Sequence, residues 1–292
     1  MRIALFGNPF PNHFNKYIQH LITRLEAEQV QILIEKEFYN YLSANIRLKK
    51  DPLTYENCSE LRGNADFVFS IGGDGTLLKA ATYVRDSNIP IMGINTGRLG
   101  FISSVATDQI DNALTGLLKG SYTIDNRTVL MLTTSNELFK SKNFALNEVA
   151  VTKKDTSSMI RIDAYIDDEF LNTYWADGLI VSTPTGSTGY SLSCGGPIIM
   201  PGTGNIIITP ITQHNLNVRP IVVEDSSTIK LKVEDRDQLA LVSLDSRSRA
   251  FDSSIELIIK KANFKIKLVE PEGNSFITTV RNKLMWGVDK RN

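Results

Sequence analysis

The densest candidate for chemistry is the glycine-rich run Gly72-Gly73-Asp74-Gly75-Thr76. It lies between the apolar segment 65–71 and the helical pattern 77–85. Glycines let the backbone approach an anion closely, and the N-terminus of the following helix offers unpaired N–H groups and a positive dipole end. The run fits neither GxxxxGK[ST] nor GxGxxG, which excludes the Walker and Rossmann phosphate loops.

An acidic residue in the middle of a phosphate-binding turn is unusual and calls for an explanation. The Asp74 carboxylate repels phosphate unless it has a task, such as accepting a hydroxyl proton or holding a divalent cation. The run therefore predicts a phosphate loop with a chemically active acid. The alternative is a plain tight turn between strand and helix, because Gly and Asp favour turns for conformational reasons.

A second candidate site begins at Asp177-Gly178 and continues as LIVSTPTGSTGYSLSCGGP to Pro197. Hydroxyl and glycine residues crowd the stretch 182–189, and Tyr190 adds an aromatic surface with a further hydroxyl. Short hydroxyl side chains are suited to hydrogen bonding with phosphate and sugar oxygens. The stretch predicts a second binding loop, although an ordinary solvated loop has the same composition.

Other polar residues give weaker indications. Asn147 and Glu148 interrupt the strand pattern FALNEVAV, and Asp245 follows LALVSL. On pattern alone these three side chains are expected to face solvent. The histidines show no metal-ligand spacing, and Cys194 has no candidate base nearby in the sequence.

The elements that must position these residues differ between the two halves of the chain. Short apolar runs and amphipathic helical patterns alternate up to about residue 122, which predicts a parallel sheet with helices on its faces. The expected strands are 2–6, 30–34, 65–71 and 89–94, and the expected helices are 14–29, 77–85 and 108–118, with Asp108 as the cap and Gly120 as the stop.

After residue 122 the pattern changes to many short β-branched segments, which predicts an antiparallel sandwich. Asp167-Asp168 is expected to form a hairpin turn. The expected strands are 128–134, 144–152, 161–166, 169–175, 178–182, 205–211, 220–223, 228–233, 239–244 and 254–259. The predicted fold class is thus an α/β, Rossmann-like N-terminal domain over 1–122 and an all-β sandwich over 123–274, with a last helix at 275–284 and the segment 275–292 rejoining the first domain.

Composition limits the class of protein. The 292 residues are 42% apolar, and 32 basic residues balance 32 acidic ones, so an extended basic surface for nucleic acid is not expected. The only cysteines, Cys58 and Cys194, fit a reducing compartment. No apolar run approaches the ~18 residues of a membrane span. A cytoplasmic protein without a membrane or nucleic-acid partner is expected.

The motifs occur together in the order seen in NAD kinases, and the chain closely resembles a bacterial member of that family. The resemblance rests on Gly72 to Thr76, on Gly93-Ile94-Asn95 with Gly97 and Leu99-Gly100-Phe101, on Asn147-Glu148, and on 177–197. It covers roughly residues 71–220. The glycine loop alone also occurs in phosphofructokinases and lipid kinases, whereas DGLIVSTPTGST with YSLS and GGP is more discriminating.

The resemblance implies transfer of a phosphoryl group from ATP to the 2′-hydroxyl of the adenosine ribose of NAD. It also implies a divalent cation, usually magnesium, a homodimer or homotetramer, and a site between an α/β domain and a β-sandwich. Asp74 matches the proton acceptor. The residues assigned to nucleotide binding are Gly72, Gly73, Gly75, Lys79, Asn147, Glu148, Asp177, Thr188, Gly189, Tyr190, Ser191, Leu192, Ser193 and Arg247.

Three positions depart from the family pattern. Gly189 replaces a usual alanine, Arg247 stands where many members have a ligand-contacting amide, and Ser158 stands where others have a basic residue. Two other functions remain open at this point. A lipid kinase with the same loop would need an apolar acceptor pocket, which the hydroxyl-rich run does not suggest, and a non-catalytic dinucleotide sensor would have no use for Asp74.

Overall fold

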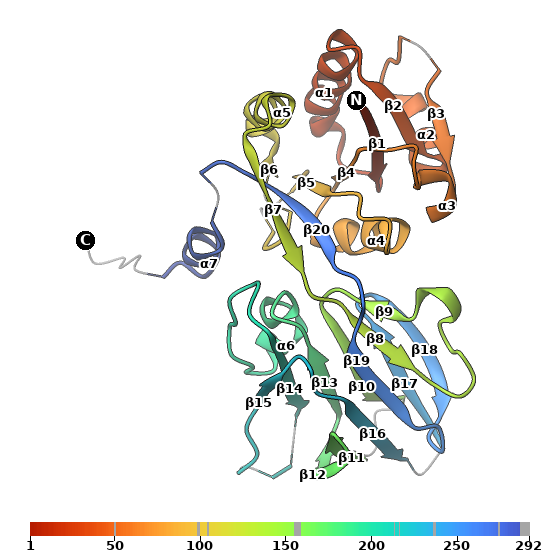
Figure 1. Ribbon diagram of the computed structural model, residues 1–292, viewed down its shortest axis with the longest axis vertical. Coiled ribbons are helices and arrows are strands. Elements are labelled where there is room, and N and C mark those ends of the chain that lie inside the picture. Colours follow the sequence, from red (N-terminus) through yellow and green to blue (C-terminus); the bar gives the residue numbers. More distant parts are fainter. Residues whose placement is uncertain are drawn as a thin grey trace. The chain divides into compact units, whose positions relative to one another are not determined.

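The computed structural model describes residues 1–49, 51–97, 100–103, 105–154, 159–212, 214–215, 217–235, 238–273 and 275–286 (Figure 1). The chain divides into two compact units. The first contains residues 1–126 and the C-terminal segment from Ile266, and the second contains Arg127–Lys265.

The first unit is built on an eight-stranded sheet in the order β3-β2-β1-β4-β5-β20-β7, with β6 paired to β5. The pairs from β3 to β5 are parallel, as is β20 with β5, so the predicted parallel sheet is confirmed. The strands are β1 Arg2–Gly7, β2 Gln31–Glu35, β3 Leu53–Tyr55, β4 Phe67–Ile71, β5 Ile91–Asn95, β6 Val105–Ala106, β7 Tyr122–Arg127 and β20 Ile266–Pro271.

Strand β20 differs from the sequence interpretation, which assigned residues up to 274 to the second domain. Its residue Leu268 pairs with Ile91 of β5, so the chain returns to the first sheet before the last helix begins. The two partners are far apart in the sequence, with the whole second unit between them. No local pattern reports which of two sheets a strand will join.

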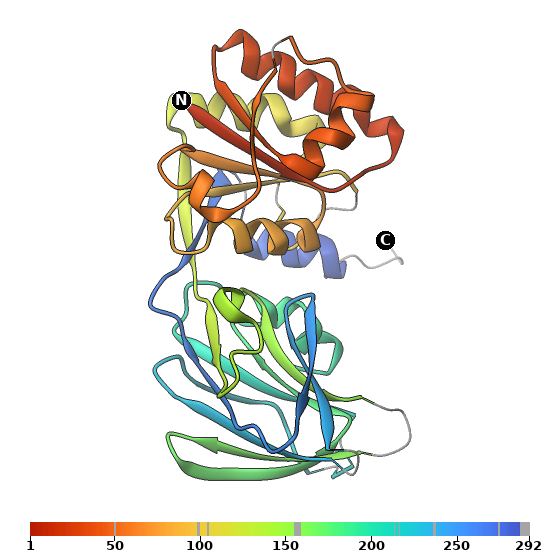
Figure 2. The ribbon, with the colours of Figure 1, turned by 90° about the vertical axis from the view of Figure 1, so that its right-hand side faces the viewer.

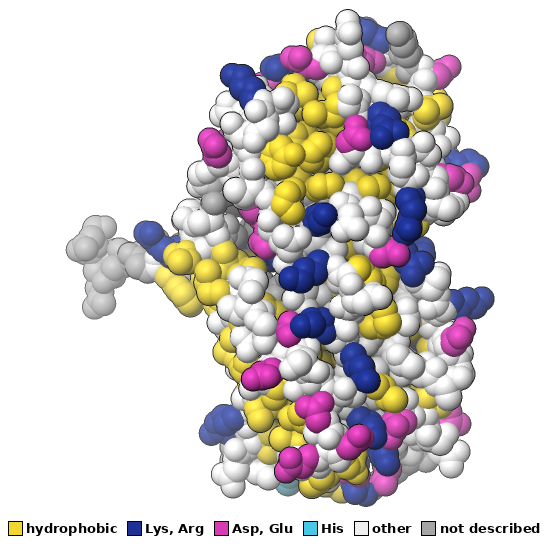
Figure 3. Space-filling view, in the orientation of Figure 1, with side chains coloured by type: hydrophobic (Ala, Val, Ile, Leu, Met, Phe, Trp, Pro, Cys, Tyr) yellow, Lys and Arg dark blue, Asp and Glu magenta, His cyan; other side chains and the backbone are white. Residues whose placement is uncertain are grey.

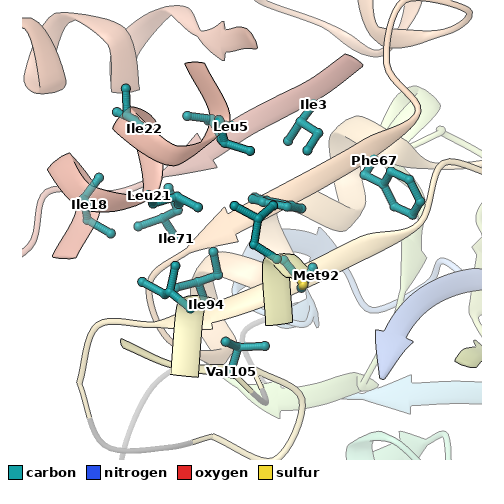
Figure 4. Packing of buried hydrophobic residues seen from close by; sticks show 14 of the residues in the cluster. Ile3, Leu5, Ile18, Leu21, Ile22, Phe67, Ile71, Met92, Ile94 and Val105 are labelled. Carbon is teal, nitrogen blue, oxygen red and sulfur yellow. The ribbon is translucent and has the colours of Figure 1, made fainter. Parts of the chain in front are cut away.

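Helices cover both faces of this sheet. The helices of this unit are α1 Asn15–Ala27, α2 Lys36–Asn45, α3 Cys58–Leu61, α4 Asp74–Val84, α5 Ile110–Lys119 and α7 Phe276–Leu284, with 3-10 turns η1 Asn12–Phe14 and η2 Thr107–Gln109. Helices α1 and α5 lie on one side of the sheet and α4 on the other (Figure 2). Ile18, Leu21, Ile22 and Leu25 are buried, as the helical spacing predicts, and pack against strand residues such as Leu5 (Figure 4).

Helix ends were predicted with mixed success. Gly120 ends α5 with a φ of 76°, as expected of a glycine stop. Asp108 is not the cap, because it lies in the 3-10 turn η2 and α5 begins only at Ile110, without a side-chain cap. The last helix begins after Ser275, whose hydroxyl accepts a hydrogen bond from the Thr278 N–H.

The second unit contains two six-stranded sheets, in the orders β15-β14-β13-β10-β17-β18 and β12-β11-β16-β19-β8-β9. The pairings are antiparallel, which confirms the predicted sandwich. The strands are β8 Leu130–Thr133, β9 Phe144–Ala145, β10 Glu148–Lys153, β11 Ile160–Ile166, β12 Glu169–Ala176, β13 Gly178–Ser182, β14 Asn205–Ile211, β15 Ile221–Glu224, β16 Ile229–Glu234, β17 Leu239–Leu244, β18 Arg247–Asp252 and β19 Leu257–Lys261.

Two turns of the sandwich are informative. Asp167 and Asp168 join β11 to β12 with φ values of 49° and 69°, the left-handed conformation of the predicted hairpin. Strand β18 was not predicted, because its sequence RSRAFD lacks apolar alternation. It lies at the edge of its sheet, where only Phe251 is buried. Among the helices that the structure describes, none is long and apolar enough to cross a membrane.

Candidate active site

The glycine loop lies at the carboxyl end of β4, the edge at which open α/β sheets bind ligands. Gly72 has a φ of 151° and donates its N–H to the Ile94 carbonyl at 2.9 Å. A Cβ on Gly72 would lie 2.2 Å from Thr76 Oγ1, so the loop needs glycine there. Gly73 is the N-cap of α4, and Asp74 is the first residue of the helix.

The Asp74 carboxylate is held by three successive backbone N–H groups. Oδ2 accepts from Phe101 at 2.8 Å, and Oδ1 accepts from Ile102 at 3.3 Å and Ser103 at 3.0 Å. This approach requires Gly100, because a Cβ there would lie 1.7 Å from Asp74 Oδ1. Asp74 is half-buried and rigidly oriented. The sequence interpretation does not predict this role of residues 101–103, although its motif Leu99-Gly100-Phe101 ends at the first of them.

Around Asp74 the loop presents an open surface. Gly73 and Gly75 are exposed, and a Cβ on either would meet no atom within 4 Å. Lys79 is exposed one helical turn after Gly75, on the same face of α4, and forms no ion pair with the described part of the chain. Packing therefore does not require glycine at positions 73 and 75. The open space there suits a phosphate group close to the backbone.

The second unit places Asn147 and Glu148 at the point where the chain passes from one sheet to the other. Strand β9 pairs with β8 in one sheet, and β10 pairs with β13 and β17 in the other. Glu148 is 7% exposed, and the Asp245 side chain is 3% exposed. The expectation that these two side chains face solvent is wrong. Asp245 accepts hydrogen bonds from the backbone amides of residues 146–148, and the Glu148 side chain lies beside Gly189, on the face of β10 opposite to the sandwich core residues Val149 and Val151.

Several polar atoms at this crossing lack partners. Asn147 Oδ1 and Glu148 Oε2 are buried and have no hydrogen-bond partner within the described ranges. Buried polar atoms are usually paired, so unpaired ones call for an explanation. Gly189 lies beside them: a Cβ there would be 3.2 Å from Glu148 Oε2 and 3.3 Å from Asn147 Nδ2. Glycine at position 189 therefore leaves space next to both side chains, which a Cβ would reduce.

The Glu148 carboxyl has an altered proton affinity. Burial, and next the negative charge of Asp245, raise its pKa from 4.5 to about 8, while the backbone N–H of Tyr190 acts in the opposite direction. The neighbouring Asp245 has its own pKa raised by burial. At neutral pH Glu148 is thus largely protonated and can donate a hydrogen bond as well as accept one.

The Glu148→Gln variant is expected to be more stable than the natural protein above pH 7. Below pH 4.5 the carboxyl is protonated in the folded and unfolded chains, so it causes no difference. Between pH 4.5 and about 8 only the unfolded chain ionises, and the stability of the folded protein falls. Urea unfolding at pH 5, 6.5 and 8.5 should show an advantage of Gln that grows to roughly 2–4 kcal/mol. An advantage independent of pH would contradict the assignment.

The hydroxyl-rich run is mostly engaged in its own folding. Thr183 Oγ1 donates to the Leu146 carbonyl at 2.7 Å and accepts from the Gly186 N–H at 3.1 Å. Ser187 Oγ donates to the Pro184 carbonyl at 2.6 Å. The predicted supply of ligand donors is therefore smaller than the composition suggests. These hydroxyls instead hold the loop against Asn147, whose carbonyl lies 2.2 Å from the position of a Cβ on Gly186.

The remainder of the run forms the turn η4 Gly186–Thr188 and the short helix α6 Tyr190–Ser193. Ser191 is buried, and its Oγ lies 2.9 Å from Thr209 Oγ1. Tyr190 and Ser193 are exposed, and Thr188 and Leu192 are half-buried. The Tyr190 side chain is 42% exposed and offers an aromatic surface to a ligand.

Asp177 and Arg247 have partners within the second unit. Asp177 Oδ1 accepts from Lys153 Nζ at 2.6 Å. Arg247 donates through Nη1 to the Lys142 carbonyl at 2.5 Å and through Nη2 to the Phe144 carbonyl. Two other residues of the sequence interpretation, Leu99 and Ser158, lie outside the described residues.

The described residues do not form a protein-based metal site. Within the part of the chain that the structure describes, no three His, Cys, Asp or Glu side chains come together as a metal site. Asp74, the acid of the glycine loop, already accepts three backbone hydrogen bonds. A cation at this loop would need most of its oxygen ligands from a bound molecule and from water.

Family models match both units. The model of the ATP-NAD kinase N-terminal domain matches residues 3–122, and that of the ATP-NAD kinase C-terminal domain matches residues 146–270. Among named relatives, the NAD kinase of Cytophaga hutchinsonii is 51% identical over 293 residues, which is 100% of both chains. The NAD kinase of Flavobacterium johnsoniae is 48% identical over 294 residues, again 100% of both chains.

Solved structures show the same architecture. The crystal structure of yeast NADH kinase complexed with NADH gives a TM-score of 0.87 at 24% identity, covering 99% of this chain and 89% of that one. The NAD kinase from Archaeoglobus fulgidus, in complex with ATP, gives a TM-score of 0.73 at 26% identity and covers 98% and 99%.

Proposed function

The chain belongs to the ATP-NAD kinase family, and from its site geometry we propose which of its residues carry the reaction. The reaction is the transfer of the γ-phosphoryl group of ATP to the 2′-hydroxyl of the adenosine ribose of NAD, which yields NADP. The observation that carries the proposal is the Asp74 carboxylate, fixed by three backbone N–H groups at the start of α4.

Asp74 is the proton acceptor. Each carboxylate oxygen has room for about two hydrogen bonds. Oδ1 accepts two and Oδ2 accepts one from the described residues, so Oδ2 retains a site for the ribose hydroxyl. As the 2′-oxygen bonds to the γ-phosphorus and the bond to ADP breaks, the hydroxyl proton passes to Asp74. Because phosphoryl transfer has a loose transition state, orientation of the hydroxyl and neutralisation of phosphate charge contribute most of the rate.

The glycine loop binds phosphate. Gly73 and Gly75 leave open space beside the N-terminus of α4, where free N–H groups favour an anion. Lys79 adds a positive charge on the same face. Asn147 and Glu148 hold the adenosine part of NAD, and their unpaired buried atoms Asn147 Oδ1 and Glu148 Oε2 mark a polar site beside Gly189. Asp177 and the segment 188–193 line the rest of the dinucleotide site.

A divalent cation, with magnesium as the natural choice, would be held mainly by the phosphates of ATP and by water. Magnesium commonly binds through substrate phosphates and waters with only one or two carboxylates. That arrangement fits a loop whose single acid is already occupied by backbone donors. The cation neutralises phosphate charge, while this chain's residues orient the hydroxyl and accept its proton.

Composition and family membership support a proposal for the partners, the compartment and the oligomeric state of the enzyme. On the face shown in Figure 3, both units carry Lys or Arg together with Asp or Glu side chains, which suits a small phosphorylated substrate better than nucleic acid. We place the protein in the cytoplasm, where Cys58 and Cys194 remain thiols, as a homodimer or homotetramer. The comparisons give no support to a lipid kinase or a dinucleotide sensor.

A coupled assay tests the proposal. Purified protein is incubated with NAD, ATP and magnesium, and the product is detected with an NADP-specific dehydrogenase. NADP formation that depends on both substrates is the expected result. Binding of NAD without any turnover, under every donor and cation tried, would instead favour the sensor function.

The Gly75→Ala variant should become more stable and less active. An added Cβ meets no atom within 4 Å, and Ala is favoured over Gly inside a helix by about 0.5–1 kcal/mol. If phosphate occupies this space, the methyl group obstructs it, and kcat/KM for ATP should fall about tenfold. Thermal unfolding and steady-state kinetics measure both effects. A stabilised variant with unchanged kinetics would exclude Gly75 from the phosphate site.

A further inference from the structure

The turn between β17 and β18 supports the chain segment that carries Asn147 and Glu148. Asp245 in this turn has a φ of 53°, an uncommon conformation for a residue other than glycine. Its Oδ1 accepts from the Asn147 N–H at 2.7 Å and the Glu148 N–H at 3.3 Å, and its Oδ2 accepts from the Leu146 N–H at 3.1 Å. One buried carboxylate thus binds three successive amides.

The N–H groups of residues 146–148 need a side-chain acceptor because the chain passes from one sheet to the other at this point. Between Ala145 of β9 and Glu148 of β10 the chain leaves one sheet and joins the other, so Leu146 and Asn147 lie outside both strands. Asp245 satisfies their N–H groups. Thr183 satisfies their carbonyls, through Oγ1 to Leu146 and through its N–H to Asn147 at 2.9 Å. A buried crossing requires this complete pairing.

Arg247, two residues further along, holds the preceding part of the same segment. Its guanidinium donates to the carbonyls of Lys142 and Phe144 and lies 5.5 Å from the centre of the Phe144 ring. It also lies 3.7 Å from Asp245 Oδ2. The two side chains of one turn therefore fix residues 142–148 from both ends. A lysine could not reproduce the paired contacts, because it lacks the planar fork of donors.

The acid at this turn satisfies the amides of the crossing, but its negative charge is unfavourable for the neighbouring Glu148. Asp245 places a second acid against the buried Glu148 and contributes to raising the pKa of that carboxyl. Two buried acids in proximity destabilise a fold, and such arrangements are concentrated at functional sites.

We propose that Asp245 and Arg247 are positioning residues that set the location of Asn147 and Glu148 for binding NAD. This rests on the proposed function of Asn147 and Glu148. Neither residue needs to touch the reacting atoms. Their loss shifts the adenosine contacts, which weakens NAD binding but leaves the ATP site and the acid Asp74 unchanged.

The test compares the natural protein with Asp245→Asn, Arg247→Lys and the control Arg249→Lys. The amide introduced by Asp245→Asn retains one acceptor oxygen but turns an NH₂ group toward the Leu146 N–H. Arg249 is on the same strand as Arg247, is exposed, and donates only to its neighbour Ser248 in the described structure. Kinetics with NAD and ATP varied separately, and thermal unfolding, are measured for all four proteins.

The expected result is a KM for NAD raised on the order of 10- to 100-fold in Asp245→Asn and about tenfold in Arg247→Lys. The kcat at saturating NAD and the KM for ATP stay within about threefold, and Arg249→Lys is unaffected. Lower thermal stability with an unchanged KM for NAD would overturn the proposal, as would an equal fall of kcat for both substrates. If Asp245→Asn does not fold, Arg247→Lys decides. A natural protein without kinase activity would refute the proposed function instead.

Discussion

Replacing Asp74 by Asn should reduce kcat by about 10²- to 10⁴-fold, the usual contribution of a positioned general base. The amide is nearly the same size, so the loop and α4 keep their shape. Its oxygen can still accept from Ile102 and Ser103, whereas its NH₂ group would face the Phe101 N–H. The variant cannot take the proton of the ribose hydroxyl. NAD binding should be retained, because the proposed adenosine-binding residues Asn147 and Glu148 belong to the second unit.

The matched control is Asp108→Asn. Asp108 is exposed in the same unit and has no hydrogen bond or ion pair with a described residue. The coupled assay gives kcat, and a titration with NAD gives the binding constant of each variant. A kcat for Asp74→Asn within tenfold of the natural protein would remove Asp74 from the chemical step. A large loss of NAD affinity would assign it to binding instead.

The location of this acid was predictable from the sequence, but its environment was not. Strand, glycines and helix follow one another in residues 67–84, so the position of Asp74 at the carboxyl edge of a sheet follows from local patterns. The three amides that hold it come from residues 101–103, beyond the end of α4 and the next strand, β5. Such a contact depends on how the loops after neighbouring parallel strands meet, and no periodicity encodes that.

The second unit shows the same limit more clearly. The pattern of short β-branched segments predicts the strands 178–182, 205–211 and 239–244 with their observed bounds. It failed for the burial of Glu148 and Asp245, because a polar residue in a strand pattern usually faces solvent. Here the chain changes sheets, and its unpaired amides draw a carboxylate into the interior. The need of buried backbone N–H groups for hydrogen-bond acceptors therefore outweighs the preference of a carboxylate for solvent.

The Gly100→Ala variant should lose about 100-fold in kcat even though it retains the Asp74 carboxylate. The new Cβ would lie 1.7 Å from Asp74 Oδ1, so the carboxylate must turn away from the amides of Ile102 and Ser103. A displacement of about 1 Å at a reacting group can cost 100-fold in rate. Because the obstructed atom is the end of a side chain, the fold should survive with a modest loss of thermal stability.

A double variant separates this mechanism from general damage to the loop. If Gly100 acts only by positioning Asp74, adding Gly100→Ala to Asp74→Asn should reduce kcat little further, since residues that act as a unit are not additive. The control is Gly204→Ala, whose added Cβ would find its nearest neighbours at an ordinary 3.6 Å. Losses that multiply in the double variant would show that Gly100 has a separate role. Losses that do not multiply would show that Gly100 acts through the orientation of the Asp74 carboxylate.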